Sequence, residues 1–237
     1  MRLTLVRNAT LIVEMGGHRI LVDPMLDDAG ARPPVGNTPN PRRNPLVPLP
    51  VPAAEIVRDL DAVIVTHLHK DHFDDRAAEL LPRDVPVFCQ PEDEESLSRR
   101  GLDASAVEET TEWDGLTISR TDGRHGTGAV AELLAPVSGF VIDDLYIVGD
   151  TVWCSEVEEA IVRHQPRVAV VNGSGARFVD SDPIVMTIDD IRHVVARVPT
   201  VVVVHLEAEN HCIETRAQVK DALPDVVVPD DGEALEL

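Results

Sequence analysis

The chain has 237 residues and a formal charge of −21, from 21 Lys and Arg against 42 Asp and Glu. This length fits one domain, residues 1–237, that buries a substantial core without disulfides or structural metals. No run approaches the ~20 apolar residues of a membrane span, and the acidic balance argues against nucleic acid and anionic membrane as partners.

The N-terminus and the cysteines indicate a cytoplasmic protein. From Met1 the sequence enters an alternating, strand-like pattern and lacks the apolar segment of a secretory signal. Cys89, Cys154 and Cys212 are odd in number and widely spaced, which fits reduced thiols better than a disulfide framework. The acidic, lysine-poor composition also fits either a salt-rich cytoplasm or a GC-rich genome.

The first 23 residues predict a β-meander. Residues 2–7 and 10–15 alternate apolar and polar side chains, and a Gly16-Gly17 turn signal precedes a third apolar run at 19–23. The following residues 27–52 contain eight prolines, which preclude a regular helix or central strand. This proline-rich insertion is either a surface excursion or a wall of the substrate site, with Arg42 and Arg43 as candidate anion contacts.

The rest of the chain alternates short apolar runs with helical patterns. We predict helices at 53–60, 74–81, 91–100, 153–164, 188–197 and 215–223, and strands at 62–65, 85–88, 113–121, 137–142, 145–148, 168–171, 201–204 and 226–228.

The strand predicted at 62–65 leads into the sequence His67-Leu-His69-Lys-Asp71-His72. If the chain stays extended, His67 and His69 point the same way, while Asp71 and His72 lie on the following turn. Imidazoles and a carboxylate suit Zn²⁺, Mn²⁺ or Fe²⁺. The alternative is a polar loop whose histidines only form caps or hydrogen bonds, but packing does not require three histidines at this spacing.

Three more candidate ligands follow predicted strands: His125, Asp150 and His205. Residues at strand ends converge at one edge of a sheet. Sorted by chemistry, the candidates form two groups, with Asp150 as the natural bridge between two cations. The first group is His67, His69 and His125, and the second is Asp71, His72 and His205. Two divalent ions, Zn²⁺ first with Mn²⁺ or Fe²⁺ as alternatives, can share a hydroxide that attacks a small ester, lactone or phosphoester.

This order of H-x-H-x-D-H, a later His, Gly-Asp-Thr and a strand-terminal His resembles the metallo-β-lactamase superfamily. The resemblance runs from the opening meander to about residue 232. It implies an αββα four-layer sandwich, with His67, His69 and His125 on the first metal, Asp71, His72 and His205 on the second, and Asp150 bridging them.

Several branches of that superfamily fit poorly. True β-lactamases carry cysteine where Asp150 stands, and flavodiiron reductases carry an acid where His69 stands. Glyoxalase II and the cleavage-factor nucleases have large additions that the few residues after His205 leave no room for. The sequence looks most like the ascorbate-6-phosphate lactonase-like branch, which implies a lactonase-like hydrolase with a small-molecule substrate, and the superfamily often forms homo-oligomers.

Asp71, Asp150 and His211 are the candidate catalytic residues. His211 is a general acid for the leaving group, a partner of a ligand, a substitute for His205 or only a loop residue. Other strand-end residues have supporting roles: Asp23 and Thr66 can orient ligand histidines, and Asn172 either contacts substrate or forms a turn. Two alternatives to a small-molecule hydrolase stay open, a phosphodiesterase or RNA-processing nuclease of the same superfamily and a non-catalytic metal-binding protein.

Overall fold

The computed structural model describes residues 1–237 and contains thirteen strands and seven helices. The strands are β1 (Arg2–Arg7), β2 (Thr10–Met15), β3 (His18–Val22), β4 (Ala62–Val65), β5 (Pro86–Cys89), β6 (Asp103–Ala106), β7 (Thr110–Trp113), β8 (Leu116–Asp122), β9 (Ser138–Ile142), β10 (Leu145–Ile147), β11 (Val168–Asn172), β12 (Thr200–Val204) and β13 (Ala234–Glu236). The helices are α1 (Ala53–Ile56), α2 (Asp75–Leu80), α3 (Pro91–Arg99), α4 (Gly128–Ala131), α5 (Ser155–His164), α6 (Ile188–Val195) and α7 (Arg216–Ala222).

The first sheet has seven strands in the order β13-β1-β2-β3-β4-β5-β6. Strands β1 to β3 form the expected antiparallel meander. Gly16 and Gly17 both have positive φ, 59° and 88°, which is the backbone that a two-residue hairpin turn between β2 and β3 requires. Strands β3 to β6 then run parallel to one another, so helices must cover this part of the sheet.

The second sheet has six strands in the order β12-β11-β10-β9-β8-β7. Its β10, β11 and β12 are parallel, and β7, β8 and β9 pair antiparallel. Strands β11 and β12 are nearly continuous runs of valine, as expected for parallel strands that are buried on both faces.

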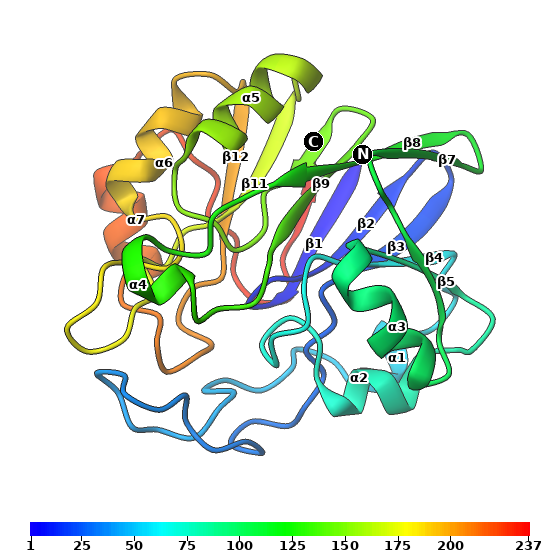
Figure 1. Cartoon of the computed structure of the whole chain (residues 1–237), viewed down its shortest axis with the longest axis horizontal. Helices are drawn as coiled ribbons and strands as arrows, with labels where there is room; N and C mark the ends of the chain where they lie inside the picture. The colour runs from blue at the N-terminus through cyan, green and yellow to red at the C-terminus, as the bar shows by residue number, and fades with distance from the viewer.

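The apolar side chains form three main clusters that define four layers. One cluster of 20 buried residues lies between the sheets and draws on strands of both. A second joins the outer face of the second sheet to α5, α6 and α7, and a third joins the outer face of the first sheet to α1, α2 and α3. Figure 1 shows the same arrangement, with the two helix groups on opposite sides of the paired sheets. The predicted αββα sandwich is therefore confirmed.

Strands β4, β8, β10 and β12 end in loops that carry the candidate ligands. The proline-rich residues 27–52 run along the lower margin of Figure 1, next to these loops. They contain no helix or named strand, only an isolated bridge between Arg32 and Asn44. The fully buried Arg7 anchors both ends of this segment, because its guanidinium donates to the carbonyls of Met25, Asp27 and Val47.

Three expectations about secondary structure were wrong. The strand expected at 113–121 starts later, as β8 at Leu116, because Trp113 ends the preceding β7 and Asp114 and Gly115, with positive φ, form the turn of this hairpin. The last strand lies at β13 rather than at 226–228, where Val227 makes only an isolated bridge and Pro229 follows. The helix expected at 53–60 ends at Ile56, and β6 and α4 were not expected at all.

No helix has both the length and the apolar content that crossing a membrane requires.

Candidate metal centre and active site

Three histidines from two loops form the first candidate metal group. His67 and His69 follow β4, and His125 follows β8. The Nε2 atom of His67 lies 2.9 Å from Nδ1 of His69, and that atom lies 3.3 Å from Nε2 of His125. One ligand atom of each residue therefore lies within 4.8 Å of the others, close enough for one ion to contact all three.

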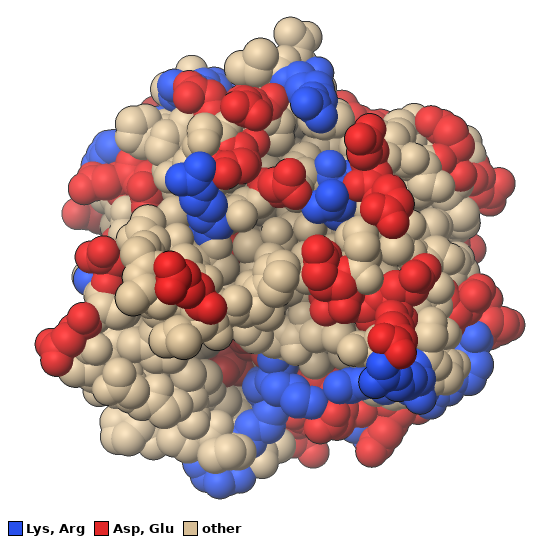
Figure 2. Space-filling view, viewed as in Figure 1, with Lys and Arg blue, Asp and Glu red and all other residues tan.

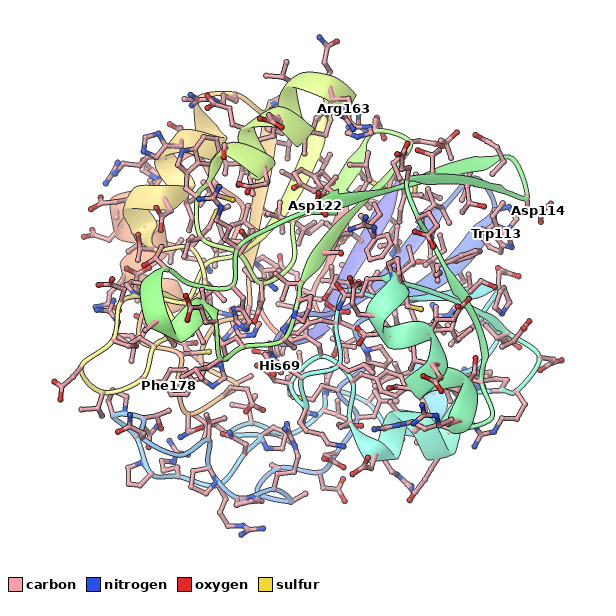
Figure 3. The ribbon with its side chains drawn as sticks, in the orientation of Figure 1. His69, Trp113, Asp114, Asp122, Arg163 and Phe178 are labelled. Atoms are coloured by element: carbon pink, nitrogen blue, oxygen red, sulfur yellow. The ribbon has the colours of Figure 1, made fainter.

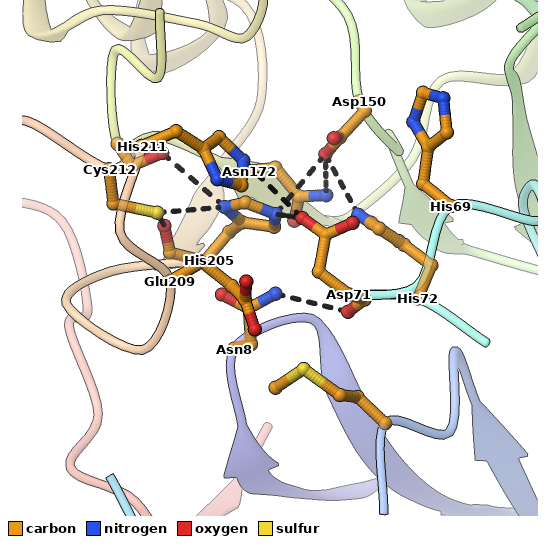
Figure 4. Close-up of polar contacts among 12 residues, drawn as sticks. Asn8, His69, Asp71, His72, Asp150, Asn172, His205, Glu209, His211 and Cys212 are labelled. Carbon is orange, nitrogen blue, oxygen red and sulfur yellow. Dashed lines mark hydrogen bonds and ion pairs between the residues drawn. The ribbon is translucent and has the colours of Figure 1, made fainter. Parts of the chain in front are cut away.

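Four buried residues form the second group: Asp71, His72, Asp150 and His205. Nε2 of His72 lies 3.2 Å from Oδ1 of Asp150, and Nε2 of His205 lies 3.3 Å from Oδ2 of Asp71. Figure 4 shows these side chains converging from three separate loops on one point. The structure thus brings together all seven residues that the sequence singled out as ligands.

Asp150 lies between the two groups. Its Oδ2 is 3.8 Å from Nε2 of His125, a member of the first group. Its Oδ1 is 3.2 Å from His72 and 3.7 Å from His205, both in the second group. One oxygen therefore faces each group, which is the arrangement that a bridging carboxylate requires.

Two neighbours fix the position of Asp150. Gly149 has a φ of +75°, and a Cβ at this residue would lie 2.7 Å from the carbonyl oxygen of Ser138. Only glycine fits there, so the chain turns tightly at the end of β10. Asn172, at the end of β11, donates from Nδ2 to Oδ1 of Asp150 at 2.7 Å. Asn172 therefore orients the carboxylate, rather than serving only as a turn residue.

Asp23 orients His72 from the neighbouring strand. Its Oδ1 accepts from the backbone N–H of Thr66 at 2.7 Å, and its Oδ2 accepts from the Thr66 hydroxyl at 2.8 Å. The same Oδ2 lies 2.7 Å from Nδ1 of His72. This contact places the proton of His72 on Nδ1 and leaves Nε2 facing the second group, as in metal-binding histidines.

His205 has a strained backbone, and two side chains contact its imidazole. Its φ is +62°, in the left-handed region that non-glycine residues rarely adopt. Its Nδ1 lies 3.3 Å from the hydroxyl of Ser174 and 3.5 Å from Sγ of Cys212. Such strain is typical of functional residues that the surrounding structure holds in place.

The two groups differ in charge. Burial lowers the pKa of His67, His69 and His125, so these imidazoles are neutral and their nitrogens are available as ligands. Burial also lowers the pKa of His72, but the carboxylates of Asp150 and Asp23 outweigh it and raise that pKa to about 10. The buried carboxylates of the second group are therefore balanced by protons on their histidines.

These residues fit two divalent cations. The first group offers three neutral nitrogens that crowd together at 2.9–3.3 Å. In the second group, Nε2 of His72 is buried and has no hydrogen-bond partner, although it points at Asp150. A divalent cation would satisfy this nitrogen and would supply the positive charge that protons otherwise provide beside Asp71 and Asp150.

His211 lies outside both groups but next to the second. Its Nε2 is 3.4 Å from Oδ2 of Asp71, and its buried Nδ1 has no partner. Burial lowers the pKa of His211, but the hydrogen bond to Asp71 outweighs it and raises that pKa to about 9. His205, not His211, takes the place in the ligand cluster, and His211 lines the cavity above it.

A cavity of about 250 Å³ opens above both groups, and we call it the inner cavity. Its polar lining includes His69, Asp150 and His211, and one wall is apolar. The apolar residues of that wall are Val35, Leu134, Phe178 and Ile184. Figure 3 shows His69 and Phe178 on the same side of the molecule, next to the proline-rich segment.

The proline-rich segment forms part of this cavity through Arg32 and Val35. Arg32 donates from Nη2 to Oε1 of the buried Glu209 at 2.8 Å. Of the two arginines expected to contact an anion, Arg43 instead donates to backbone carbonyls of its own segment, and neither it nor Arg42 lines the cavity. The segment is therefore a wall of the site, and Arg32 is its basic residue there.

Several residues of the site were not identified from the sequence. Asn8 donates to the backbone carbonyl of Asp71 at 3.1 Å, and Ser174 and Glu209 contact His205 and Arg32. Ser174 stands in the Asn-Gly-Ser-Gly loop after β11, so its place after a strand was a usable signal. Asn8 and Glu209 carried none, because only the folded chain brings them to the site.

Comparison with known proteins agrees with this geometry. A family model described as a β-lactamase superfamily domain matches residues 18–206. The UPF0173 protein YddR of Bacillus subtilis is 36% identical over 99% of both chains. A UPF0173 metal-dependent hydrolase of Azorhizobium caulinodans is 27% identical over 72% of each chain. The crystal structure of an isothiocyanate hydrolase from Delia radicum gut bacteria is similar with a TM-score of 0.93, at 33% identity over 100% of this chain and 99% of that one.

The fold and the clustered histidines and aspartates define a metal-dependent hydrolase. More narrowly, the chain belongs to the family whose model is described as a β-lactamase superfamily domain. It is a hydrolase of the metallo-β-lactamase superfamily.

Proposed function

We propose that the protein uses two divalent metal ions to hydrolyse a small, uncharged electrophile with an apolar substituent, such as an ester, a lactone or an isothiocyanate. The observation that carries this proposal is the position of the two ligand groups, side by side at the floor of a partly apolar cavity. Two such ions, Zn²⁺ first with Mn²⁺ or Fe²⁺ as alternatives, would make water nucleophilic at neutral pH and polarise the bond under attack.

The protein's own residues hold and orient this chemistry. Asp150 faces both groups and is kept in place by Asn172, so it would contribute to holding both ions. Asp71 belongs to the second group and also contacts His211 at 3.4 Å. His211 lines the inner cavity, where it can hydrogen-bond to the leaving group and supply its proton. Asp71, Asp150 and His211 are thus our candidate catalytic residues.

The surroundings of the cavity favour an uncharged substrate over a phosphoester. The two basic residues that line it are Arg32 and Lys70. Arg32 is paired with Asp27 at 3.1 Å and with Glu209 at 2.8 Å, and Lys70 is paired with Asp75 at 2.6 Å. Both cations are already paired with carboxylates, so a phosphate would have to compete with these partners.

The similarity to an isothiocyanate hydrolase adds one compound class to the lactone and ester candidates. Water adds to the central carbon of R–N=C=S, and the resulting thiocarbamic acid breaks its C–N bond to give R–NH₂ and carbonyl sulfide. This reaction needs only water and proton transfer, which the site can supply. A relationship to the ascorbate-6-phosphate lactonase-like branch remains part of the proposal.

The nuclease and the non-catalytic alternatives have less support. A net charge of −21 repels RNA, and both basic residues at the cavity are already paired. A metal that only stabilised the fold would not require a cavity above it. His211, whose Nδ1 has no hydrogen-bond partner, lines this cavity.

The test combines metal analysis with a substrate panel. We expect about two equivalents of metal per chain, because seven ligands form two groups. We also expect turnover of at least one ester, lactone or isothiocyanate. Asp150→Ala should lose turnover and retain one equivalent or none, whereas the exposed Asp221→Ala on α7 should retain both. Full activity of Asp150→Ala, or protein that cannot be loaded beyond one equivalent, would exclude the two-metal mechanism.

A further inference from the structure

The inner cavity is small and adjoins a second hollow. Its volume of about 250 Å³ lies below the ~300–1,000 Å³ that is typical of ligand pockets. A second hollow of about 600 Å³, which we call the outer hollow, shares the lining residues Leu134 and Phe178 with it. The two spaces adjoin at these residues, so a ligand with its reactive group at the metal centre can extend past them.

The outer hollow lies between α4 and the loop that carries Phe178, and its walls are mainly apolar. Besides Leu134 and Phe178, the side chains of Val130, Leu133 and Val179 line it. Leu133 is 84% exposed and Val179 is 44% exposed, while α4 itself buries no residue. Apolar side chains gathered at a hollow, rather than scattered over the surface, are typical of a binding site.

The charge around the hollow limits what it can bind. No Lys or Arg lines it, and Asp180 and Asp182 do. In Figure 2, the left-hand part of the face, where Figure 1 places α4 and the 176–185 loop, is mainly uncharged, and most of the charged groups within it are acidic. A carboxylate or phosphate at the far end of a ligand would be repelled, and the apolar side chains that line the hollow favour an uncharged group over a cation.

We propose that the outer hollow binds the neutral alkyl or aryl substituent of the substrate and so sets the protein's preference for substituent length. This inference rests on the proposed hydrolase function and specifies its substrate class. Leu134 and Phe178 form the passage between the reacting group and the substituent. Burial of each methylene is worth ~0.8 kcal/mol, which is about fourfold in kcat/KM.

The test uses substrates that differ only in the length of one alkyl chain. These are n-alkyl isothiocyanates from methyl to octyl and, in parallel, the methyl esters of C2 to C8 alkanoic acids. We expect kcat/KM to rise about two- to fourfold per methylene over several carbons. Leu133→Glu, which places a charge in the hollow, should lower the octyl-to-methyl ratio of kcat/KM at least tenfold. Val162→Glu is the matched control, because Val162 is 68% exposed on α5, away from the hollow, and should leave that ratio unchanged.

A direct binding measurement separates this proposal from the hydrolase function. The fluorescent probe N-phenyl-1-naphthylamine should bind the native protein, be displaced by n-octanol but not by ethanol, and bind weakly to Leu133→Glu. If no compound is hydrolysed but the probe binds in this way, the hydrolase function fails and the apolar site stands. A kcat/KM that does not change with chain length, with probe binding equal in both variants, would overturn the site. A dimer that only Leu133→Glu dissociates, with a flat series, would assign the hollow to a second copy of the chain instead.

Discussion

Asn210 is the residue on which the position of the proline-rich wall depends most directly. Its side-chain Oδ1 accepts from the N–H of Val35 at 3.0 Å and from Nδ2 of Asn44 at 2.7 Å. Its Nδ2 donates to the carbonyls of Val35 and Asn40 and to the hydroxyl of Thr38. The Asn210 side chain is fully buried, and its bond to Asn44 lies away from water, while its other partners are partly buried. Replacement of Asn210 should therefore release the wall.

The expected magnitude follows from the groups left without partners. A buried polar group that loses its partner costs about 1–3 kcal/mol, and groups near the surface recover part of this from water. Several of the partners of Asn210 are only partly buried, so we expect Asn210→Ala to lower the free energy of unfolding by about 2–4 kcal/mol. Asn210→Asp should have an effect of similar size, because it keeps the acceptor but loses the three donor bonds of Nδ2.

Urea denaturation measures this change, and trypsin reports on the wall itself. Arg42 and Arg43 lie in the segment that Asn210 holds, so native-state cleavage there should become at least tenfold faster in Asn210→Ala. KM should rise more than kcat falls, because the wall lines the cavity through Val35 while the metal ligands stay in place. Unchanged stability together with an unchanged cleavage rate at Arg42 and Arg43 would refute this account of the wall.

Three further predictions concern the metal centre and the core. Gly149→Ala should destabilise the fold and lower metal affinity at Asp150, because the new Cβ would lie 2.7 Å from the carbonyl oxygen of Ser138. Calorimetry measures the stability and metal titration the affinity. A variant with native metal content would contradict this prediction. Chelation should lower Tm by several degrees and addition of Zn²⁺ should restore it, since bound metal stabilises only the folded state. Burial raises the pKa of Asp93 to about 6, although Gln90 donates to it. The folded state then binds the proton of Asp93 more tightly than the unfolded state does. The stability that this proton contributes is full below about pH 4 and is lost as pH rises through 6. In urea titrations at several pH values, the free energy of unfolding of Asp93→Asn should fall by about 1–3 kcal/mol less over this range than that of the native protein.

The ligand groups could be predicted from the sequence because their signals are local. Four of the ligands stand within six residues after an apolar strand: His67, His69, Asp71 and His72. Their spacing does not depend on how the rest of the chain folds. His205 also followed an apolar run that the structure shows as a strand. For such residues, the end of a strand in a parallel sheet is itself the location of the site.

The walls of the cavity could not be predicted, because they depend on contacts between distant segments. Asn210 meets Val35 across 175 residues, and no periodicity or spacing in either segment signals this pairing. Phe178 and Leu134 lie in loops of irregular sequence, so nothing distinguished them from other surface residues. The ligands could therefore be assigned at once, whereas the part of the site that selects the substrate appeared only in the folded chain.

One short segment connects the metal centre to the substrate wall. Residues 205–212 contain His205 in the second metal group, Glu209 paired with Arg32, and Asn210, which is hydrogen-bonded to the proline-rich segment. His205 and Glu207 both have positive φ, so the backbone around them has few alternative conformations. The same short segment therefore supplies a ligand to the second metal group and the side chains that hold the wall in place.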